Sequence, residues 1–207
     1  MSSSSFLDKP QTPIVIDASV VINLNATGRA HEIFAAFPNP FLVTANAAAE
    51  LSHGARNGHT DSAALQQLVS QSLLQTVDLD PTDLAIYETL IEGSAAQTLD
   101  DGEAATIAFA LGASAMAIID ERKARNICAS RFQGLHVFST VDLLLHEALH
   151  KALGKFGQID AIVAALRGAR MRVPPDSIAT VVALIGEANA AKCHSLPRAA
   201  RFTQAVN

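Results

Sequence analysis

Short apolar runs alternate with longer segments in which apolar residues recur every three or four positions over the first 140 residues. A short apolar run bounded by polar residues is typical of a buried strand, and the wider spacing is typical of an amphipathic helix. The runs predict strands over residues 14–17, 41–43, 74–79, 117–120 and 134–138. The intervening segments predict a helix or loop over 19–34 and helices over 45–56, 62–72, 81–91, 100–111 and 122–130. This alternation indicates an α/β fold with a mostly parallel central sheet and helices on both faces.

The last third of the chain has a different pattern. Three helical stretches are predicted there with no strand between them, over residues 141–153, 158–167 and 176–190. We therefore expect an α/β domain over residues 13–140 and a C-terminal helical extension over residues 141–207. The serine-rich opening, residues 1–12, is expected to be a flexible N-terminal segment.

Composition and charge limit the class of protein. The 207 residues, 49% of them hydrophobic, suffice for one sizeable core with a small appendage. No apolar run reaches the roughly 18 residues of a membrane span, and the first residues lack signal-peptide features, so we expect a cytoplasmic protein with no membrane contact. Cys128 and Cys193 are too isolated for a zinc cluster or a disulfide framework. The net charge of −5 disfavours nonspecific coating of nucleic acid, so any such contact needs a local basic patch.

Two of the predicted strands end in an aspartate, Asp17 and Asp120. The carboxyl ends of parallel strands meet at one edge of a sheet, where α/β proteins bind their ligands. Glu50 and Glu103 lie near the starts of helical segments that such a sheet would bring to the same edge. Four converging carboxylates without matched cations repel one another, and a divalent cation is the usual compensation. The sequence therefore predicts a metal-dependent phosphoryl-transfer site.

Each of these acids also has a purely structural interpretation. Asp17 and Asp120 could serve as caps of the helices that follow them and have no other role. Glu50 could be a solvated helix residue. Glu103 lies on the apolar side of its predicted helix, but with Asp100 it could also form a capping box.

Several neighbouring side chains are candidate auxiliaries to the acids. The Ser19 hydroxyl could orient Asp17 or a metal-bound water, Asp101 could substitute as a ligand, and Glu121 could reach the metal. The structural alternatives are a helix-entry serine and first-turn acids that favour the helix dipole.

A basic cluster follows the second aspartate, formed by Arg122, Lys123 and Arg125. A basic rim beside an acidic metal centre suits a nuclease, because cations hold the phosphodiester backbone while the metal ion activates water. An ordinary surface helix is the alternative interpretation.

Taken in order, four segments resemble the acidic motifs of the PIN domain family: residues 14–19, Glu50, residues 99–104 and residues 118–125. The segments 157–159, 166–167 and 171–173 resemble a PIN-like subfamily with a C-terminal helical extension. The resemblance implies a three-layer α/β/α sandwich, Mg²⁺ or Mn²⁺ at the acidic site, and VapC-like ribonuclease activity, often as the toxin of a toxin-antitoxin pair. An antitoxin protein is then an expected partner beside the RNA substrate.

Carried over to this sequence, the acidic quartet is Asp17, Glu50, Glu103 and Asp120, as catalytic and metal-binding residues. Many PIN domains have aspartate where Glu103 stands, and the longer side chain alters the metal geometry. We expect Asp17 and Asp120 to hold the principal ion, Glu50 and Glu103 to complete the site, and Arg122, Lys123 and Arg125 to contact RNA.

A catalytically inactive interaction module is the competing interpretation. Residues 161–166 and 181–185 carry apolar stripes that could pack on the domain itself, form a homodimer or receive a protein partner. A metal-dependent phosphatase is disfavoured, because Ser19 stands where a second aspartate would be needed. His146 and His150 are one helical turn apart but lack the acid of the metalloprotease pattern, so they are interpreted as a surface pair.

Overall fold

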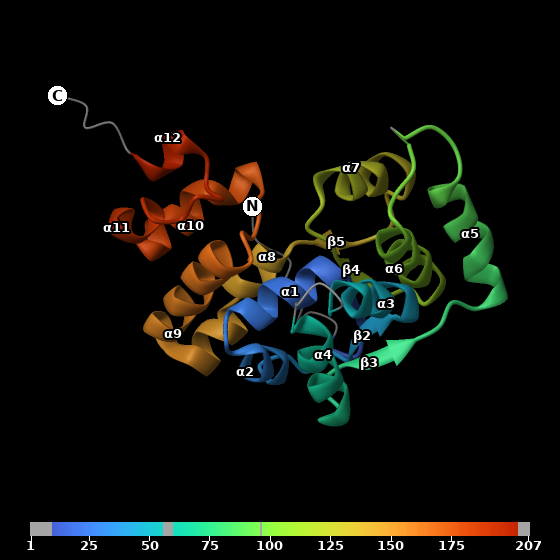
Figure 1. Ribbon diagram of the computed structural model, residues 1–207, viewed down its shortest axis with the longest axis horizontal. Coiled ribbons are helices and arrows are strands. Elements are labelled where there is room, and N and C mark those ends of the chain that lie inside the picture. The colour runs from blue at the N-terminus through green and yellow to red at the C-terminus, as the bar shows by residue number, and fades with distance from the viewer. Residues whose placement is uncertain (1–9, 56–59, 96, 203–207) are drawn as a thin grey trace. The chain divides into compact units, whose positions relative to one another are not determined.

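The computed structural model describes residues 10–55, 60–95 and 97–202 (Figure 1). Most of the segment expected to be flexible, residues 1–12, lies outside the described residues. The described chain divides into two compact units, one comprising residues 10–21 and 37–138 and the other residues 22–36 and 139–202. The domain limits expected from the sequence stay a prediction, although the grouping of residues 22–36 with the C-terminal part was not part of it.

The first unit is built on a five-stranded sheet in which all neighbouring strands are parallel. The strand order is β3-β2-β1-β4-β5. Ile14 on the central strand is paired with Phe41 on one side and Met116 on the other. The bounds are β1 Ile14–Ile16, β2 Phe41–Thr44, β3 Gln75–Val77, β4 Met116–Ile118 and β5 Val137–Phe138.

This strand order creates a switch point next to the central strand. From β1 the chain proceeds to β2 and β3 on one side of the sheet, whereas β4 and β5 add to the other side. Crossover connections therefore leave β1 and β4 in opposite directions, which opens a crevice beyond their carboxyl ends. The topology alone makes this edge the expected position of a functional site.

Helices flank the sheet of the first unit, as the alternating pattern predicted (Figure 1). The fold is therefore α/β with a central parallel sheet, and the predicted fold class is confirmed. The helix α1 begins in this unit and continues into the second. The bounds are α1 Ala18–Ala26, α3 Ala45–Ala55, α4 Asp61–Ser70, α5 Pro81–Ile91, α6 Asp101–Gly112 and α7 Arg122–Arg131.

The helix α6 lies deep in the core of the first unit. Eight of its twelve residues are buried, and it packs on β1, β2 and β4 as well as on α3 and α5. Its alanines and Gly102 allow this close approach, whereas Ile107 fills space beside Val15 and Ala117. Because nearly the whole circumference is buried, an acid in the first turn of α6 also enters a low-dielectric environment.

The junction of α5 and α6 depends on a glycine. The start of α5 is capped by Asp80, whose Oδ1 accepts hydrogen bonds from the backbone N–H groups of Thr82 and Asp83. The Asp83 side chain is 4% exposed and lies against the end of α6. A Cβ atom at Gly112 would overlap Asp83 Oδ1, so the absence of a side chain at Gly112 is what lets the two helices pack.

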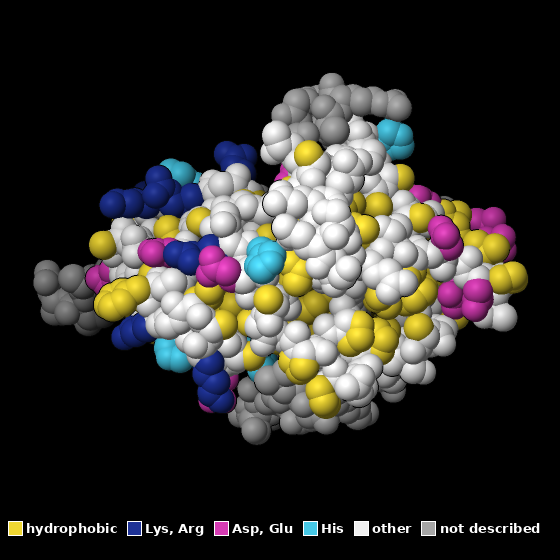
Figure 2. Space-filling model, turned by 90° about the horizontal axis from the view of Figure 1, so that it is seen from below, with side chains coloured by type: hydrophobic (Ala, Val, Ile, Leu, Met, Phe, Trp, Pro, Cys, Tyr) yellow, Lys and Arg dark blue, Asp and Glu magenta, His cyan; other side chains and the backbone are white. Residues whose placement is uncertain are grey.

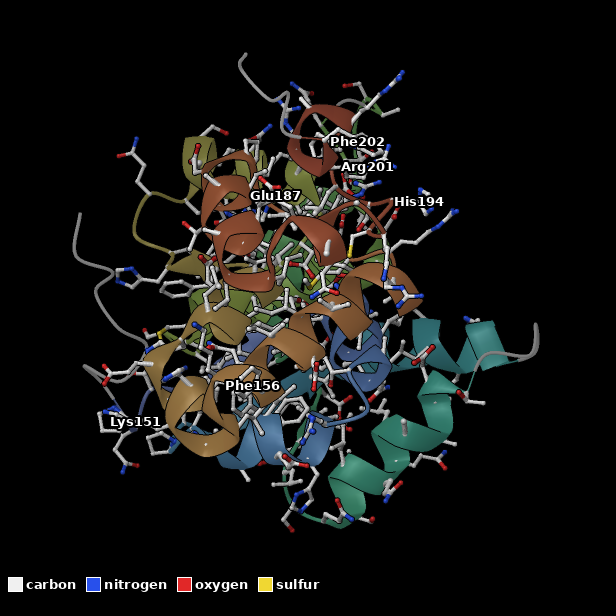
Figure 3. The ribbon with its side chains drawn as sticks, turned by 90° about the vertical axis from the view of Figure 1, so that its left-hand side faces the viewer. Lys151, Phe156, Glu187, His194, Arg201 and Phe202 are labelled. Atoms are coloured by element: carbon white, nitrogen blue, oxygen red, sulfur yellow. The ribbon has the colours of Figure 1, made fainter. Side chains whose placement is uncertain are left out.

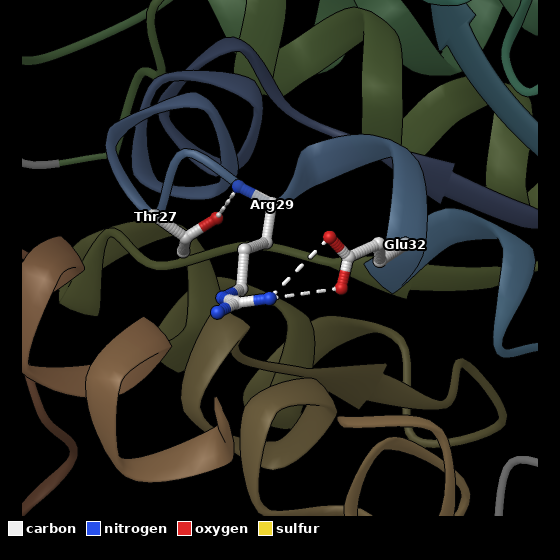
Figure 4. A network of polar contacts seen from close by, with 3 residues as sticks. All are labelled: Thr27, Arg29 and Glu32. Carbon is white, nitrogen blue, oxygen red and sulfur yellow. Dashed lines mark hydrogen bonds and ion pairs between the residues drawn. The ribbon is translucent and has the colours of Figure 1, made fainter. Parts of the chain in front are cut away.

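The regular elements in the described residues of the second unit are all helices, including a 3₁₀ turn at Pro175–Ser177. Its first part follows a turn in which Thr27 Oγ1 accepts a hydrogen bond from the Arg29 backbone N–H, and Arg29 pairs with Glu32 at 3.0 Å (Figure 4). The bounds are α2 Ala30–Ala35, α8 Thr140–Leu145, α9 Glu147–Gly168, α10 Ile178–Ile185, α11 Glu187–Ala190 and α12 Arg198–Arg201.

Two of the predicted C-terminal helices are each split by one residue. His146 ends α8 in an extended conformation, and its Nδ1 accepts a hydrogen bond from the Ala148 backbone N–H at the start of α9. Gly186, with φ of 78°, separates α10 from α11. A break was expected after residue 153, and Gly154 provides it with φ of 67° inside α9. His146 is therefore a helix cap, so its Nδ1 is already occupied.

Two expectations from composition can be compared with the described residues. Among them, no helix is long and apolar enough to cross a membrane. Cys128 and Cys193 are both buried free thiols.

Candidate active site

Asp17 and Asp120 follow two neighbouring strands, β1 and β4, at the carboxyl edge of the sheet. Asp17 directly follows β1, and its backbone N–H donates a 3.2 Å hydrogen bond to the Ile118 carbonyl oxygen at the end of β4. Asp120 lies two residues beyond Ile118 and is half-buried. Both aspartates therefore lie at the switch point, on the edge of the sheet that the sequence pattern predicted.

Only one oxygen of the Asp17 carboxylate is engaged. Oδ2 accepts a 2.7 Å hydrogen bond from the Ser19 hydroxyl and a 3.3 Å bond from the Ser19 backbone N–H. The residue is 4% exposed, and its Oδ1 is buried with no hydrogen-bond partner among the described residues. The cap interpretation accounts for Oδ2 alone. A buried carboxylate oxygen without a donor is energetically costly, and the cap interpretation does not explain why Oδ1 is left in that state.

Glu50 is connected to the first turn of α6. Its Oε1 accepts a 2.7 Å hydrogen bond from the Gly102 backbone N–H, one of the free donors at the helix start. A Cβ atom at Gly102 would lie 2.8 Å from the Glu50 carboxyl carbon. Glu50 is thus half-buried and bound, not simply solvated, and Gly102 is a site residue that the sequence interpretation missed.

Glu103 lies one residue further along α6 and is 9% exposed. Burial, together with the negative charges of Asp17, Asp100 and Glu121, raises its pKa to about 7, against one backbone hydrogen bond from Asp100. The capping-box alternative fails in one half, because the Asp100 side chain makes no cap hydrogen bond. A carboxyl held in this field favours the neutral form in the absence of a cation.

The same negative charges act on Asp17 and Glu50. Burial raises the pKa of Asp17, hydrogen bonds from Ser19 and the Ala18 backbone lower it, and the charge of Asp100 raises it. Burial also raises the pKa of Glu50; the Gly102 hydrogen bond opposes this, and the charges of Asp17 and Asp100 add to it. Asp17, Glu50 and Glu103 therefore belong to one electrostatic cluster.

Asp100 is a member of this cluster that the sequence interpretation treated only as a helix cap. Its charge raises the pKa of Asp17, Glu50 and Glu103, although its own side chain is exposed. The signal was present in the sequence as three acids within four residues, Asp100 to Glu103.

Asp101 faces a different set of partners. Its Oδ2 accepts a 3.0 Å hydrogen bond from the Asn46 amide, and its Oδ1 accepts one from the Tyr87 hydroxyl. The bond to Asp101 raises the pKa of Tyr87 to about 12. Both oxygens of this candidate auxiliary ligand are thus used to join α3, α5 and α6.

The basic residues after Asp120 are divided between two positions on α7. Arg122 and Lys123 line a shallow groove of about 390 Å³ along α7, together with Glu121, Asn126, Ile127 and Ser130. Lys123 also donates a 2.6 Å hydrogen bond to the Ala95 carbonyl oxygen. Arg125 does not line this groove, and its half-buried side chain has one nitrogen, Nη1, buried without a partner among the described residues.

The acidic cluster suits a divalent cation in the chemistry of its donors. Hard oxygen ligands, the unpartnered Asp17 Oδ1 and the mutual repulsion of the acids all favour a bound positive charge. However, no three acid, histidine or cysteine side chains of the described chain lie close enough to form a ready metal cage. Coordination of an ion would therefore require these side chains to move closer together.

Comparison with known proteins supports this description of the fold. The family model of the PIN domain matches residues 13–187, which covers the whole sheet and most of the helical unit. The chain has no significant match among curated proteins or solved structures. PIN domains are generally nucleases that use divalent metals. With this match across most of its length, the chain belongs to the PIN domain family.

Proposed function

We propose that this protein is a divalent-metal-dependent ribonuclease that hydrolyses RNA phosphodiester bonds at the carboxyl edge of its sheet. The observation that carries the proposal is Asp17. Its carboxylate is buried, one of its oxygens has no partner, and nearby acids add negative charge instead of neutralising it. A buried charge in such surroundings is stabilised by an ion of opposite charge. Family membership supports the nuclease class.

In this proposal Asp17 and Asp120 hold the principal Mg²⁺ or Mn²⁺ ion, and Glu50 and Glu103 complete the site directly or through water. The ion, when bound, supplies a nucleophilic hydroxide and stabilises the charge that develops on the phosphate. The protein needs no nucleophilic side chain of its own. As in other metal-assisted hydrolyses, its contribution is to hold ligands, orient the substrate and fix the charge distribution.

Contacts in the first unit support these proposed roles of the acids. Ser19 occupies Asp17 Oδ2 and so leaves Oδ1 as the donor for the ion. The Gly102 N–H fixes Glu50 Oε1, so its second oxygen is the one left to turn toward the cluster. Glu103 enters the cluster from the buried start of α6.

RNA would be oriented by the basic residues of α7. Arg122 and Lys123 line the groove together with Glu121, and the charge of Glu121 also contributes to the raised pKa of Glu103. Phosphate contacts of this kind position the backbone without reading its sequence. Arg125, whose side chain is half-buried, is the third proposed RNA contact.

The test is cleavage of a panel of single-stranded and structured RNA by the purified full chain. Each RNA is incubated with Mg²⁺, with Mn²⁺, and with a chelator followed by addition of excess metal. The proposal expects cleavage in both metals, none with the chelator and recovery on addition of metal. Cleavage that persists in chelator would contradict the proposed dependence on a divalent metal ion.

A partner-binding module is the second candidate, favoured by an apolar groove in the helical unit. The groove, of about 680 Å³, lies among α10, α11 and α12 and is lined mainly by small and aliphatic side chains, including Ile178, Val182 and Ala199. An antitoxin or a second copy of this chain is the proposed occupant of this groove. A toxin role likewise stays a proposal. If the RNA panel shows no cleavage and equilibrium dialysis shows no divalent-ion binding, this candidate replaces the nuclease.

A further inference from the structure

The two units carry opposite net charge. Residues 1–21 and 37–138 contain six Lys and Arg against fourteen Asp and Glu, whereas residues 22–36 and 139–207 contain nine against six. Figure 2 shows exposed Lys and Arg side chains in dark blue and exposed Asp and Glu side chains in magenta on one face. The helical unit therefore carries a net positive charge, although the whole chain is net negative.

The cations of this unit are concentrated near its C-terminus. Residues 167–201 contain six Lys and Arg but only two acids, Asp176 and Glu187. Arg167, Arg170, Lys192 and Arg198 are exposed, and none of them forms an ion pair with another described residue. Their charge is therefore free to act on a partner.

Packing brings two segments of this region together. The Ser195 hydroxyl donates a 3.0 Å hydrogen bond to the Leu166 carbonyl oxygen at the end of α9. Arg167 directly follows Leu166, so this bond brings it close to the turn that carries Lys192. Arg201 in α12 reaches back to His194 in the same turn, with 3.1 Å between Nη1 and Nδ1.

An exposed aromatic ring completes the cluster. The Arg201 guanidinium lies 5.6 Å from the centre of the Phe202 ring, and Phe202 is 55% exposed. Figure 3 shows Arg201, Phe202 and His194 near one another, and Lys151 and Phe156 at the opposite end of the helical unit. We name this cluster the C-terminal basic surface and define it as Arg167, Lys192, Arg198, Arg201 and Phe202.

We propose that the C-terminal basic surface binds single-stranded RNA, with the cations on the phosphates and Phe202 stacked on a base. Cations that track a backbone next to an exposed aromatic ring are the combination that single-stranded nucleic acid requires. Duplex RNA cannot offer a base face to Phe202, and an acidic protein would use the cations but gain little from the ring. The proposal rests on RNA as the substrate class of the proposed function, but not on catalysis.

The proposal is tested by RNA binding of the full chain in chelator, where no metal-dependent cleavage takes place. The triple variant Arg167→Gln, Lys192→Gln, Arg198→Gln is compared with Arg29→Gln, Lys151→Gln, Lys155→Gln, which removes the same charge elsewhere in the same unit. Phe202→Ala is compared with Phe156→Ala, since Phe156 is 81% exposed. The probes are a single-stranded RNA, a duplex RNA and an acidic peptide of equal length.

We expect the first triple variant to bind single-stranded RNA at least about tenfold more weakly in about 0.1 M salt. The slope of the logarithm of the binding constant against the logarithm of the salt concentration should fall by the equivalent of about two phosphate contacts. The control triple should stay within about twofold to threefold of the parent chain. Phe202→Ala should lose about tenfold on single strands and little on duplex, whereas Phe156→Ala should lose nothing.

The opposite pattern would overturn the proposal. Equal losses in both triple variants would show only a general charge effect, and stronger binding of the acidic peptide than of RNA would assign the surface to a protein partner. Failure of the cleavage panel would leave these binding results unchanged, so the two proposals can fail separately.

Discussion

Glu50 Oε1 accepts a 2.7 Å hydrogen bond from the backbone N–H of Gly102, so a carboxylate from α3 is fixed on the first turn of α6. The bond joins two segments 52 residues apart in the chain. It depends on the absence of a side chain at Gly102, because a Cβ atom there would approach the Glu50 carboxyl group to 2.8 Å. One backbone position thus determines where an acid of the candidate site lies.

The Gly102→Ala change should therefore reduce catalysis more than stability. Glu50 is a flexible side chain that can swing away, so we expect RNA cleavage to fall at least about tenfold, while the free energy of unfolding falls by about 1 kcal/mol. Cleavage rates and thermal unfolding of the same preparation measure both effects. Gly134→Ala is the control, because a Cβ atom at Gly134 meets nothing within 4 Å. Cleavage at the parental rate in Gly102→Ala would contradict a role for the Glu50 position.

Stability of the metal-free protein should depend on Glu103. Its pKa is raised from 4.5 to about 7, so the folded state resists ionisation. The sign follows: Glu103 favours folding below pH about 4.5, and this contribution is lost as the pH rises to about 7. The loss is on the order of 2–3 kcal/mol. Urea unfolding in chelator at several pH values should show it for the parent chain and not for Glu103→Gln.

Glu88→Gln is the matched control for this prediction, since Glu88 is an exposed acid on α5. Addition of Mg²⁺ or Mn²⁺ near pH 7 should restore stability to the parent chain more than to Glu103→Gln. An identical pH dependence in the parent chain and Glu103→Gln would show that Glu103 is not in the repulsive field described above.

His146 should give the helical unit the opposite dependence on pH. Its neutral Nδ1 accepts the Ala148 N–H at the start of α9, and burial lowers its pKa below the usual 6.5. This contribution is present above pH about 6.5 and is lost as the pH falls, because a protonated imidazole cannot accept the bond. His146→Asn keeps a cap acceptor that does not titrate in this range. The difference in unfolding free energy between parent and variant should therefore shift with pH between about 5 and 7.5, and a constant difference would be inconsistent with the cap.

The packing of Gly112 against Asp83 predicts a large loss of stability in Gly112→Ala. The added Cβ would overlap Asp83 Oδ1, so either this buried side chain or the helices α5 and α6 would have to shift. We expect a cost of about 1–3 kcal/mol, as in other overpacked cores. In the double variant Asp83→Ala, Gly112→Ala the added methyl group has space, so the two costs should not add. Additive costs in denaturant unfolding would show that the two residues do not interact.

The sequence predicted the sheet and its two terminal aspartates for a clear physical reason. The runs before Asp17 and Asp120 are short and wholly apolar, and alternation with helices leaves a parallel sheet as the arrangement that buries them. The order of the strands places both aspartates at one edge. Their proposed roles in metal binding and catalysis stay predictions.

The parts that the sequence did not reveal depend on contacts between distant segments. The sequence around Gly102 gives no sign that its backbone N–H binds Glu50. Asp100 has the sequence context of an ordinary helix cap. Apolar residues continue on both sides of Gly186, so the local pattern predicts one helix where the backbone turns. The inclusion of residues 22–36 in the helical unit likewise follows from long-range packing.

The most direct test of the central claim is RNA cleavage by the parent chain, Asp17→Asn and Asp78→Asn, measured across a range of Mg²⁺ and Mn²⁺ concentrations. Asp78 is an exposed acid in the same unit, so its variant makes the same chemical change outside the cluster. If Asp17 holds the catalytic ion, Asp17→Asn should lose at least about a thousandfold in rate and keep its fold by circular dichroism, while Asp78→Asn cleaves like the parent chain. Equal metal-dependent cleavage by all three proteins would contradict the claim.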